Sequence, residues 1–289
     1  MITSRFHGAI RDRVESLATM RMNGIHPIEV AELWSAEIQS LIPDNLALTG
    51  SFGRQEATFT SDLDLVPLGP VSPESLNALL SQGLAIDADG VSPFSKALPK
   101  TEAEWHDRMP GWALDPSQDQ GVVYTGLLAD LSHPVREEAA RHFNGHEIVR
   151  GMLIDALSSR PPRVKGFLAR GSIDLKHEFI VPIVKLARWG NLASGHSDLS
   201  TLRRLANINT TIISKEEAKD LSASFKSLME FKMDIELDLV RDVIPGRSNS
   251  VLIGPLTDSH KSALEKSRKT IRAVQARLDY LLSTSTFSY

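Results

Sequence analysis

Hydrophobic residues recur every three to four positions along most of this chain, which is the spacing of amphipathic helices. Two such segments come first, one over residues 4–22 and one from Pro27 to about residue 42. The dipeptide Asn23-Gly24 separates them, and proline is favoured at the first position of a helix. The pattern therefore predicts two N-terminal helices that pack on the structure that follows.

The spacing changes after these helices. A short apolar run ends at Gly50-Ser51, and an alternating run of polar and apolar residues covers residues 61–66. In a strand, residues two apart project from the same face. If residues 61–66 form a strand, Asp62 and Asp64 lie side by side, and the leucine after each of them faces a core.

The next part of the chain mixes helix and strand signals. Helices are predicted over residues 73–81, 101–112 and 135–158, and a short edge strand is predicted near residues 84–86. The apolar run from Gly121 to Asp130 predicts a buried strand that ends in an acidic residue.

A Ser-Ser-Arg-Pro-Pro stretch at residues 158–162 is the clearest domain boundary. Beyond it the spacing is helical, with a capping box at Ser214–Glu217 before one long helix and Asp258 before another. The predicted fold class is α+β for residues 1–158, a mixed sheet with flanking helices. An all-α helical bundle over residues 163–289 is predicted to follow.

Composition and charge exclude several kinds of site and partner. The 289 residues include no cysteine, which excludes disulfides and thiolate metal sites. The formal net charge of −4 gives no general attraction to nucleic acid, and no apolar run approaches the ~18 residues of a membrane span. The N-terminal segment lacks the apolar core of a secretory signal. We therefore expect a soluble cytoplasmic protein that binds neither membranes nor nucleic acid.

The aspartate pair and the glycine-serine corner point to one chemistry. Two rises of roughly 3.3 Å place the backbones of Asp62 and Asp64 about 7 Å apart, close enough for their carboxylates to share two divalent cations. Gly50 leaves room for a phosphate to approach the backbone beside Ser51. A lone S-D-x-D string usually forms a solvated, capped turn, but apolar runs flank this one on both sides. The combination predicts phosphoryl transfer.

The same residues carry a family resemblance. Gly50-Ser51, Arg54, Glu56 and Ser61-Asp62-Leu63-Asp64 resemble the signature of the DNA-polymerase-β-like nucleotidyltransferases. The string is most similar to the branch of the PII-protein uridylyltransferases and the glutamine-synthetase adenylyltransferases, although Gln55 stands where glycine is frequent. The second half resembles the helical substrate-binding domain that follows the catalytic domain in those relatives, at Asp174-Leu-Lys176, Pro182 and Ser200 to Arg203.

This resemblance implies transfer of a nucleoside monophosphate, UMP or AMP, from a nucleoside triphosphate (NTP) to a hydroxyl, with release of pyrophosphate. Asp62, Asp64 and Asp130 would hold two Mg²⁺ ions, for which Mn²⁺ could substitute, and Asp130 would help to activate the hydroxyl. The residues expected to bind the triphosphate are Gly50, Ser51, Arg54 and Lys176. The alternatives are an ion pair of Arg54 with Glu56 and one of Lys176 with Asp174.

The expected acceptor is a protein side chain. The first alternative is a small molecule such as an antibiotic or a sugar. The second is a sensor that binds NTP and Mg²⁺ without transferring a group. A tRNA acceptor is disfavoured by the acidic balance of the chain and by its lack of a long basic arm.

Overall fold

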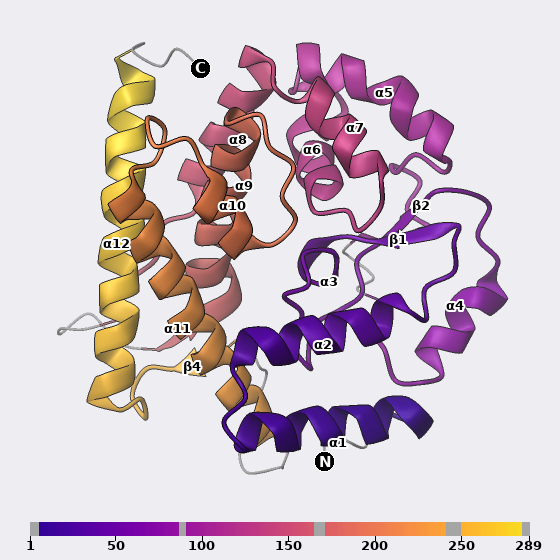
Figure 1. Cartoon of the computed structure of the whole chain (residues 1–289), viewed down its shortest axis with the longest axis vertical. Helices are drawn as coiled ribbons and strands as arrows, with labels where there is room; N and C mark the ends of the chain where they lie inside the picture. The colour runs from indigo at the N-terminus through magenta and orange to yellow at the C-terminus, as the bar shows by residue number, and fades with distance from the viewer. Residues whose placement is uncertain (1–5, 87–90, 165–170, 241–249, 285–289) are drawn as a thin grey trace.

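Figure 1 shows a computed structural model of the chain, which describes residues 6–86, 91–164, 171–240 and 250–284. Helices dominate these residues: α1 Gly8–Met22, α2 Pro27–Gln39, α3 Gly50–Gly53, α4 Pro73–Leu80, α5 Glu102–Leu114, η2 Gln118–Gln120, α6 Gly121–Ala129, α7 Val135–His142, α8 His146–Ser158, η3 Lys176–Ile180, α9 Val181–Ala193, α10 Thr201–Asn207, α11 Lys215–Val240 and α12 Asp258–Ser283. The described strands are short: β1 Leu46–Leu48, β2 Leu65–Pro67, β3 Ser172–Asp174 and β4 Ser250–Leu252.

The two N-terminal helices form as predicted. Helix α1 ends at Asn23-Gly24, where Gly24 has a φ of +92°, and α2 has Pro27 at its first position. The residues of their apolar stripes are buried: Ile10, Val14, Leu17, Val30, Trp34 and Ile38. Both helices therefore bury the faces that the periodicity assigns to the core.

The sheet around the aspartate pair is smaller than the predicted mixed sheet. Strands β1 and β2 pair antiparallel, and an isolated parallel bridge joins Leu63 to Ile86. Leu63 and Leu65 are buried, whereas Asp62 and Asp64 are half-buried. The alternation along residues 61–66 is confirmed, but only its last part and the bridge at Leu63 have strand pairing.

The prediction of a buried strand from Gly121 to Asp130 is wrong. These residues form helix α6, with Asp130 as its C-terminal cap. An apolar run of this kind suits a buried helix as well as a buried strand, because periodicity alone does not separate the two. Tyr124 of α6 packs against Trp105 and Trp112 of α5, with ring centroids 6.1 and 4.9 Å apart, so α6 is part of a buried aromatic cluster.

The predicted single helix over residues 135–158 is two helices. Helix α7 ends before Phe143, and α8 begins after Gly145, which caps it in an extended conformation. Asn144-Gly145 is a turn signal, and burial of Phe143 fixes the bend. The break lets α7 turn back over α5 and α6 (Figure 1).

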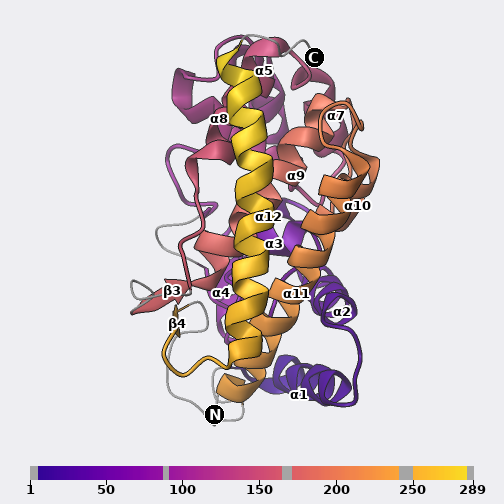
Figure 2. The same ribbon diagram turned by 90° about the vertical axis from the view of Figure 1, so that its left-hand side faces the viewer.

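The second half is mainly helical, but it is not all-α. Strands β3 and β4 pair antiparallel beside the lower end of α12 (Figure 2). Helix α9 packs between α8 and α10, and the long helices α11 and α12 pack along each other. The capping box is confirmed, because Ser214 and Glu217 each accept a hydrogen bond from the other's backbone N–H, at 3.2 and 2.9 Å. Thr257 rather than Asp258 caps α12.

The buried apolar residues form one continuous core that crosses the predicted boundary at residues 158–162. Helix α8 lies before this boundary and packs against α9 after it, and α2 packs against α11. None of the described helices is both long enough and apolar enough to span a membrane. The contacts between the halves position the candidate site.

Candidate active site

Gly50 holds the corner between β1 and α3 directly against Asp64. Its φ is +61°, and a Cβ at this position would lie 2.2 Å from Oδ2 of Asp64. The backbone is fixed nearby, because the Thr49 N–H donates to the carbonyl oxygen of Asp64 at 3.0 Å. Any side chain at residue 50 would collide with this carboxylate. The glycine-serine corner and the aspartate pair are thus one structural unit.

The surroundings of Asp64 only partly offset the negative charge of its carboxylate. Burial raises the pKa of Asp64 to about 6, and the nearby Asp62 also raises it, while Lys176, the N–H of Val91 and Arg54 oppose this rise. A bound cation would offset the remaining negative charge. Mg²⁺ is commonly held by one or two carboxylates, with water and substrate phosphates completing its shell, so this donor set fits a hard divalent cation.

Lys176 reaches the aspartate pair from the other half of the chain. It is the first residue of η3 and lies close enough to Asp64 to lower the pKa of that carboxyl. Burial would raise the pKa of Asp174, the predicted alternative partner, but it is lowered by hydrogen bonds from the backbone N–H of His177 at 2.8 Å and the His177 ring at 2.9 Å, and by the charge of Lys176. Lys176 therefore lies near both Asp64 and Asp174, and it is a cation that the second half brings to Asp64.

Arg54 is buried between two carboxylates. It donates from Nε to Glu56 at 2.7 Å and from Nη1 to Asp130. Burial by itself would lower the pKa of Arg54, but the two carboxylates raise it above its usual range. The alternative pairing with Glu56 is thus present in the structure, and the guanidinium points into the protein.

Asp130 is the centre of an arginine cluster. Besides Arg54, its carboxylate accepts hydrogen bonds from Arg188 at 3.1 and 2.5 Å and from Arg204 at 2.8 Å. Burial would raise the pKa of Asp130, but the three guanidinium groups hold it well below its usual range. Within the described residues, no three acidic or histidine side chains are arranged to hold a metal ion, so Asp130 does not form such a group with Asp62 and Asp64.

Asp130 nevertheless lies beside β1, close to residues 50–64, which carry the family resemblance and are called the signature turn below. The N–H of Ser132 donates to the carbonyl oxygen of Leu48 at 2.9 Å. A Cβ on Gly53 would lie 2.0 Å from the carbonyl oxygen of Asp130, so the two backbones are in close contact there. The structure therefore brings Gly50, Asp62, Asp64 and Lys176 together. Arg54 links this group to Asp130, whose carboxylate is held by three arginines.

Three further residues at this junction were not predicted as part of the site: Arg188 on α9, and Thr201 and Arg204 on α10. The backbone N–H and the hydroxyl of Thr201 both donate to Glu56, the latter at 3.0 Å. Glu56 thereby caps the first turn of α10 across the two halves. A buried Arg204 that also donates to the carbonyl oxygen of Ala129 at 2.6 Å completes the junction.

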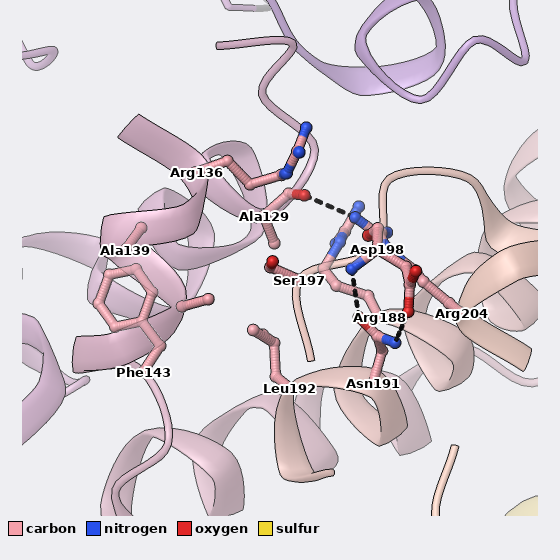
Figure 3. Close-up of a pocket in the computed structure, with 11 residues that line it drawn as sticks. Ala129, Arg136, Ala139, Phe143, Arg188, Asn191, Leu192, Ser197, Asp198 and Arg204 are labelled. Atoms are coloured by element: carbon pink, nitrogen blue, oxygen red, sulfur yellow. Dashed lines mark hydrogen bonds between the residues drawn. The ribbon is translucent and has the colours of Figure 1, made fainter. Parts of the chain in front are cut away.

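A small cavity borders the arginine cluster (Figure 3). Arg188, Asn191, Asp198 and Arg204 line one side, and apolar side chains that include Phe143 line the other. Its volume of about 10 Å³ is close to the space for one water molecule, so it is too small for a nucleotide. The cavity belongs to the packing of the arginine cluster.

Comparison with known families gives a match in the second half. Residues 148–281 match the family model described as "Putative nucleotidyltransferase substrate binding domain". The match begins inside α8 and covers slightly less than half of the chain. No curated protein matches the sequence. The match supports a nucleotidyltransferase-like family and, with it, an enzyme of the transferase class.

Proposed function

We propose that this protein is a metal-dependent nucleotidyltransferase that transfers UMP or AMP from an NTP to a hydroxyl on a protein side chain, with release of pyrophosphate. The observation that carries the proposal is the meeting of Asp62 and Asp64 with the Gly50 corner and with Lys176. Lys176 comes from the region that matches a nucleotidyltransferase substrate-binding domain. The protein acceptor rests on the resemblance of residues 50–64 to the PII-protein uridylyltransferases and their relatives.

In this proposal each residue has a defined task. Asp62 and Asp64 would hold Mg²⁺ or Mn²⁺, and two such ions are expected by the resemblance. Bound ions of this kind act as Lewis acids and offset phosphate charge. Gly50 and Ser51 would bind the triphosphate through backbone N–H groups and the serine hydroxyl, as the resemblance implies, and Lys176 would supply a positive charge beside it. The catalytic contribution of the protein is then mainly positioning and charge neutralisation.

Arg54 and Asp130 receive different tasks from those that the resemblance implies. Both are buried in ion pairs, so the contacts support a positioning role in which they join the signature turn to α9 and α10. A role for Asp130 as metal ligand or general base would require its carboxylate to leave three guanidinium groups. We therefore assign the direct cation contacts to Asp62 and Asp64.

The test is a labelling assay. The protein is incubated with each of the four NTPs, labelled on the α-phosphate, together with Mg²⁺ and a cell lysate. We expect label on a macromolecule with one preferred NTP, and loss of this label in Asp62→Asn/Asp64→Asn. Asp12→Asn, an exposed change on α1, is the matched control and should label normally. Absence of label with all four NTPs would contradict the proposal.

The ion pairs of Asp130 with three arginines favour a second candidate function, a sensor that binds NTP and Mg²⁺ without transferring a group. Two carboxylates suffice to bind a cation with its nucleotide, whereas a third commonly serves the acceptor hydroxyl in the family that the signature resembles. A sensor would bind one NTP tightly in the presence of Mg²⁺ and would neither label an acceptor nor release pyrophosphate. Equilibrium binding measured beside the labelling assay separates the two functions.

A further inference from the structure

A buried carboxylate on α11 reaches the loop that carries the aspartate pair. Glu236 is 0% exposed and accepts three hydrogen bonds from this loop. Thr58 donates through its hydroxyl at 2.7 Å, and Thr60 donates through its hydroxyl at 2.7 Å and its backbone N–H at 3.2 Å. Lys232, one turn earlier on α11, pairs with Glu236 and donates to the Thr58 hydroxyl at 2.8 Å. All these groups come together between the two halves of the chain.

The loop that Glu236 contacts leads directly into Asp62. Thr58 and Ser61 close a tight turn, in which the N–H of Thr58 donates to the Ser61 hydroxyl at 2.9 Å and the N–H of Ser61 donates to the carbonyl oxygen of Thr58 at 3.0 Å. Asp62 is the next residue. Holding Thr58 and Thr60 therefore fixes where the chain enters the aspartate pair.

We propose that Glu236 is a positioning residue that sets the geometry of Asp62 and Asp64 from α11. This inference rests on the proposed function for the cation-binding role of those two aspartates. It makes α11, within the region that matches a substrate-binding domain, a support of the cation site as well as a part of its own helical bundle.

Stability alone does not account for such a buried ion pair, because apolar side chains of similar volume often stabilise a core equally well. The pair with Lys232 also leaves one oxygen of Glu236 for the backbone N–H of Thr60, a bond that fixes main-chain position. Helix α11 is itself fixed to α1, through Arg21 with Glu230 and Asp234 at 3.2 and 2.8 Å. Helix α11 thus adds contacts from the second half to a turn that local bonds and the bond of Ala57 to Ser35 also hold.

The experiment compares backbone hydrogen exchange and Mn²⁺–NTP binding in the full-length wild type and variants. Glu236→Gln keeps the volume but replaces one acceptor oxygen with a donor. Thr58→Val removes the partner hydroxyl. Leu221→Ala, a core change elsewhere on α11, controls for general loss of stability. Exchange is read at the amides of Thr60 and Ser61, and Mn²⁺ affinity is read by electron paramagnetic resonance with each NTP.

We expect Glu236→Gln to speed exchange at these two amides at least tenfold and to weaken Mn²⁺–NTP binding about tenfold. Thr58→Val should act in the same direction but more weakly, because it removes the bond of Thr58 to Glu236 and leaves the two bonds of Thr60. The double variant should exceed Glu236→Gln only slightly, because Glu236→Gln already weakens the bond that Thr58→Val removes. Leu221→Ala should speed exchange at Thr60 and Ser61 no more than at the amides of the other buried helices, since it lowers global stability, whereas Glu236→Gln should speed these two amides selectively. Leu221→Ala should also keep its Mn²⁺ affinity within twofold.

Unchanged exchange at Thr60 and Ser61 in Glu236→Gln would overturn the inference, whether or not the protein is a nucleotidyltransferase. Faster exchange with unchanged Mn²⁺ affinity would also overturn it, because the turn would then not position the aspartates. A wild-type protein that binds no Mn²⁺–NTP would refute the proposed function and the cation part of this inference together. Because exchange is measured without nucleotide, the two failures are distinguishable.

Discussion

Gly50 is the residue at which backbone conformation and site geometry depend on each other. Replacing it with alanine places a Cβ 2.2 Å from Oδ2 of Asp64 and puts an L-residue at a φ of +61°. The backbone strain alone costs about 1–2 kcal/mol, and displacement of Asp64 adds to it. We expect Gly50→Ala to lose Mn²⁺–NTP binding by at least tenfold and to lower the free energy of unfolding, measured by urea denaturation.

Gly8→Ala is the matched control for this prediction. Gly8 has a φ of +54°, and nothing lies within 4 Å of the position where its Cβ would be. It should show the backbone strain without any effect on metal binding. If the two variants bind Mn²⁺–NTP equally well, the close approach of residue 50 to Asp64 does not affect metal–nucleotide binding.

The raised pKa of Asp64 predicts a pH dependence of stability. Because the pKa is about 6 in the folded protein and 3.8 without its surroundings, the folded state binds the proton more tightly. The associated stability is fully present below pH 3.8 and is lost as the pH rises through 6, a difference of at most about 3 kcal/mol. In metal-free buffer, Asp64→Asn should therefore gain stability relative to wild type between pH 4.5 and pH 7.5.

Urea denaturation at these two pH values measures the effect, with Asp12→Asn as an exposed control. A difference between Asp64→Asn and wild type that is the same at both pH values would show that burial of this carboxyl carries no net cost. Addition of Mg²⁺ with nucleotide should reduce the difference at pH 7.5, because a bound cation favours the ionised form.

At the scale of elements, Asp130 joins the end of α6 to α9 and α10. Replacing it with asparagine leaves Arg54, Arg188 and Arg204, two of them buried, without their shared counter-charge, and breaking a buried ion pair in this way typically costs about 3–5 kcal/mol. Asp155→Asn, which removes a half-buried pair with Lys185 at 2.7 Å, should cost about 0–1 kcal/mol. Urea denaturation measures both. A loss of Mn²⁺ affinity without a loss of stability in Asp130→Asn would instead identify it as a metal ligand.

Local patterns predicted those elements whose apolar residues occupy one face. Helices α1, α2, α11 and α12 have such stripes, and the alternation at Asp62 to Leu65 assigned the correct faces. The run in α6 is apolar on all sides, so its period distinguished neither helix from strand. The break between α7 and α8 depended on burial of Phe143, which is decided by packing rather than by local sequence.

Local sequence patterns could not predict the arginine cluster either, but for a different reason. Arg188 and Arg204 reach Asp130 across 58 and 74 positions of sequence, so only the folded chain brings them together. Each arginine alone resembles a solvated helix residue. Local sequence could suggest which residues of the candidate site lie together where they are adjacent in sequence, as in residues 50–64, and the basic stretch of residues 160–188 pointed to Lys176 in the second half.

At the scale of the whole molecule, the two halves share buried polar contacts as well as one apolar core. Glu56 with Thr201, Asp130 with Arg188 and Arg204, and Thr58 with Glu236 all cross between them. An independent domain would be expected to satisfy such groups internally. The signature turn is therefore completed by side chains from the region that matches a substrate-binding domain.

A fragment of residues 1–158 should consequently fail to fold as an independent unit. Without the rest of the chain, the apolar faces of α2 and α8 that pack on α11 and α9 would be exposed, and Asp130 would lose its ion pairs with Arg188 and Arg204. We expect broad, non-cooperative thermal unfolding by circular dichroism and strong binding of a hydrophobic dye, whereas the full chain unfolds in one cooperative step. Co-expression with residues 159–289 should restore cooperative unfolding if the shared contacts are the cause. A fragment 1–158 that unfolds cooperatively alone would instead show that the N-terminal half is a self-sufficient domain and that the contacts between the halves serve only to align them.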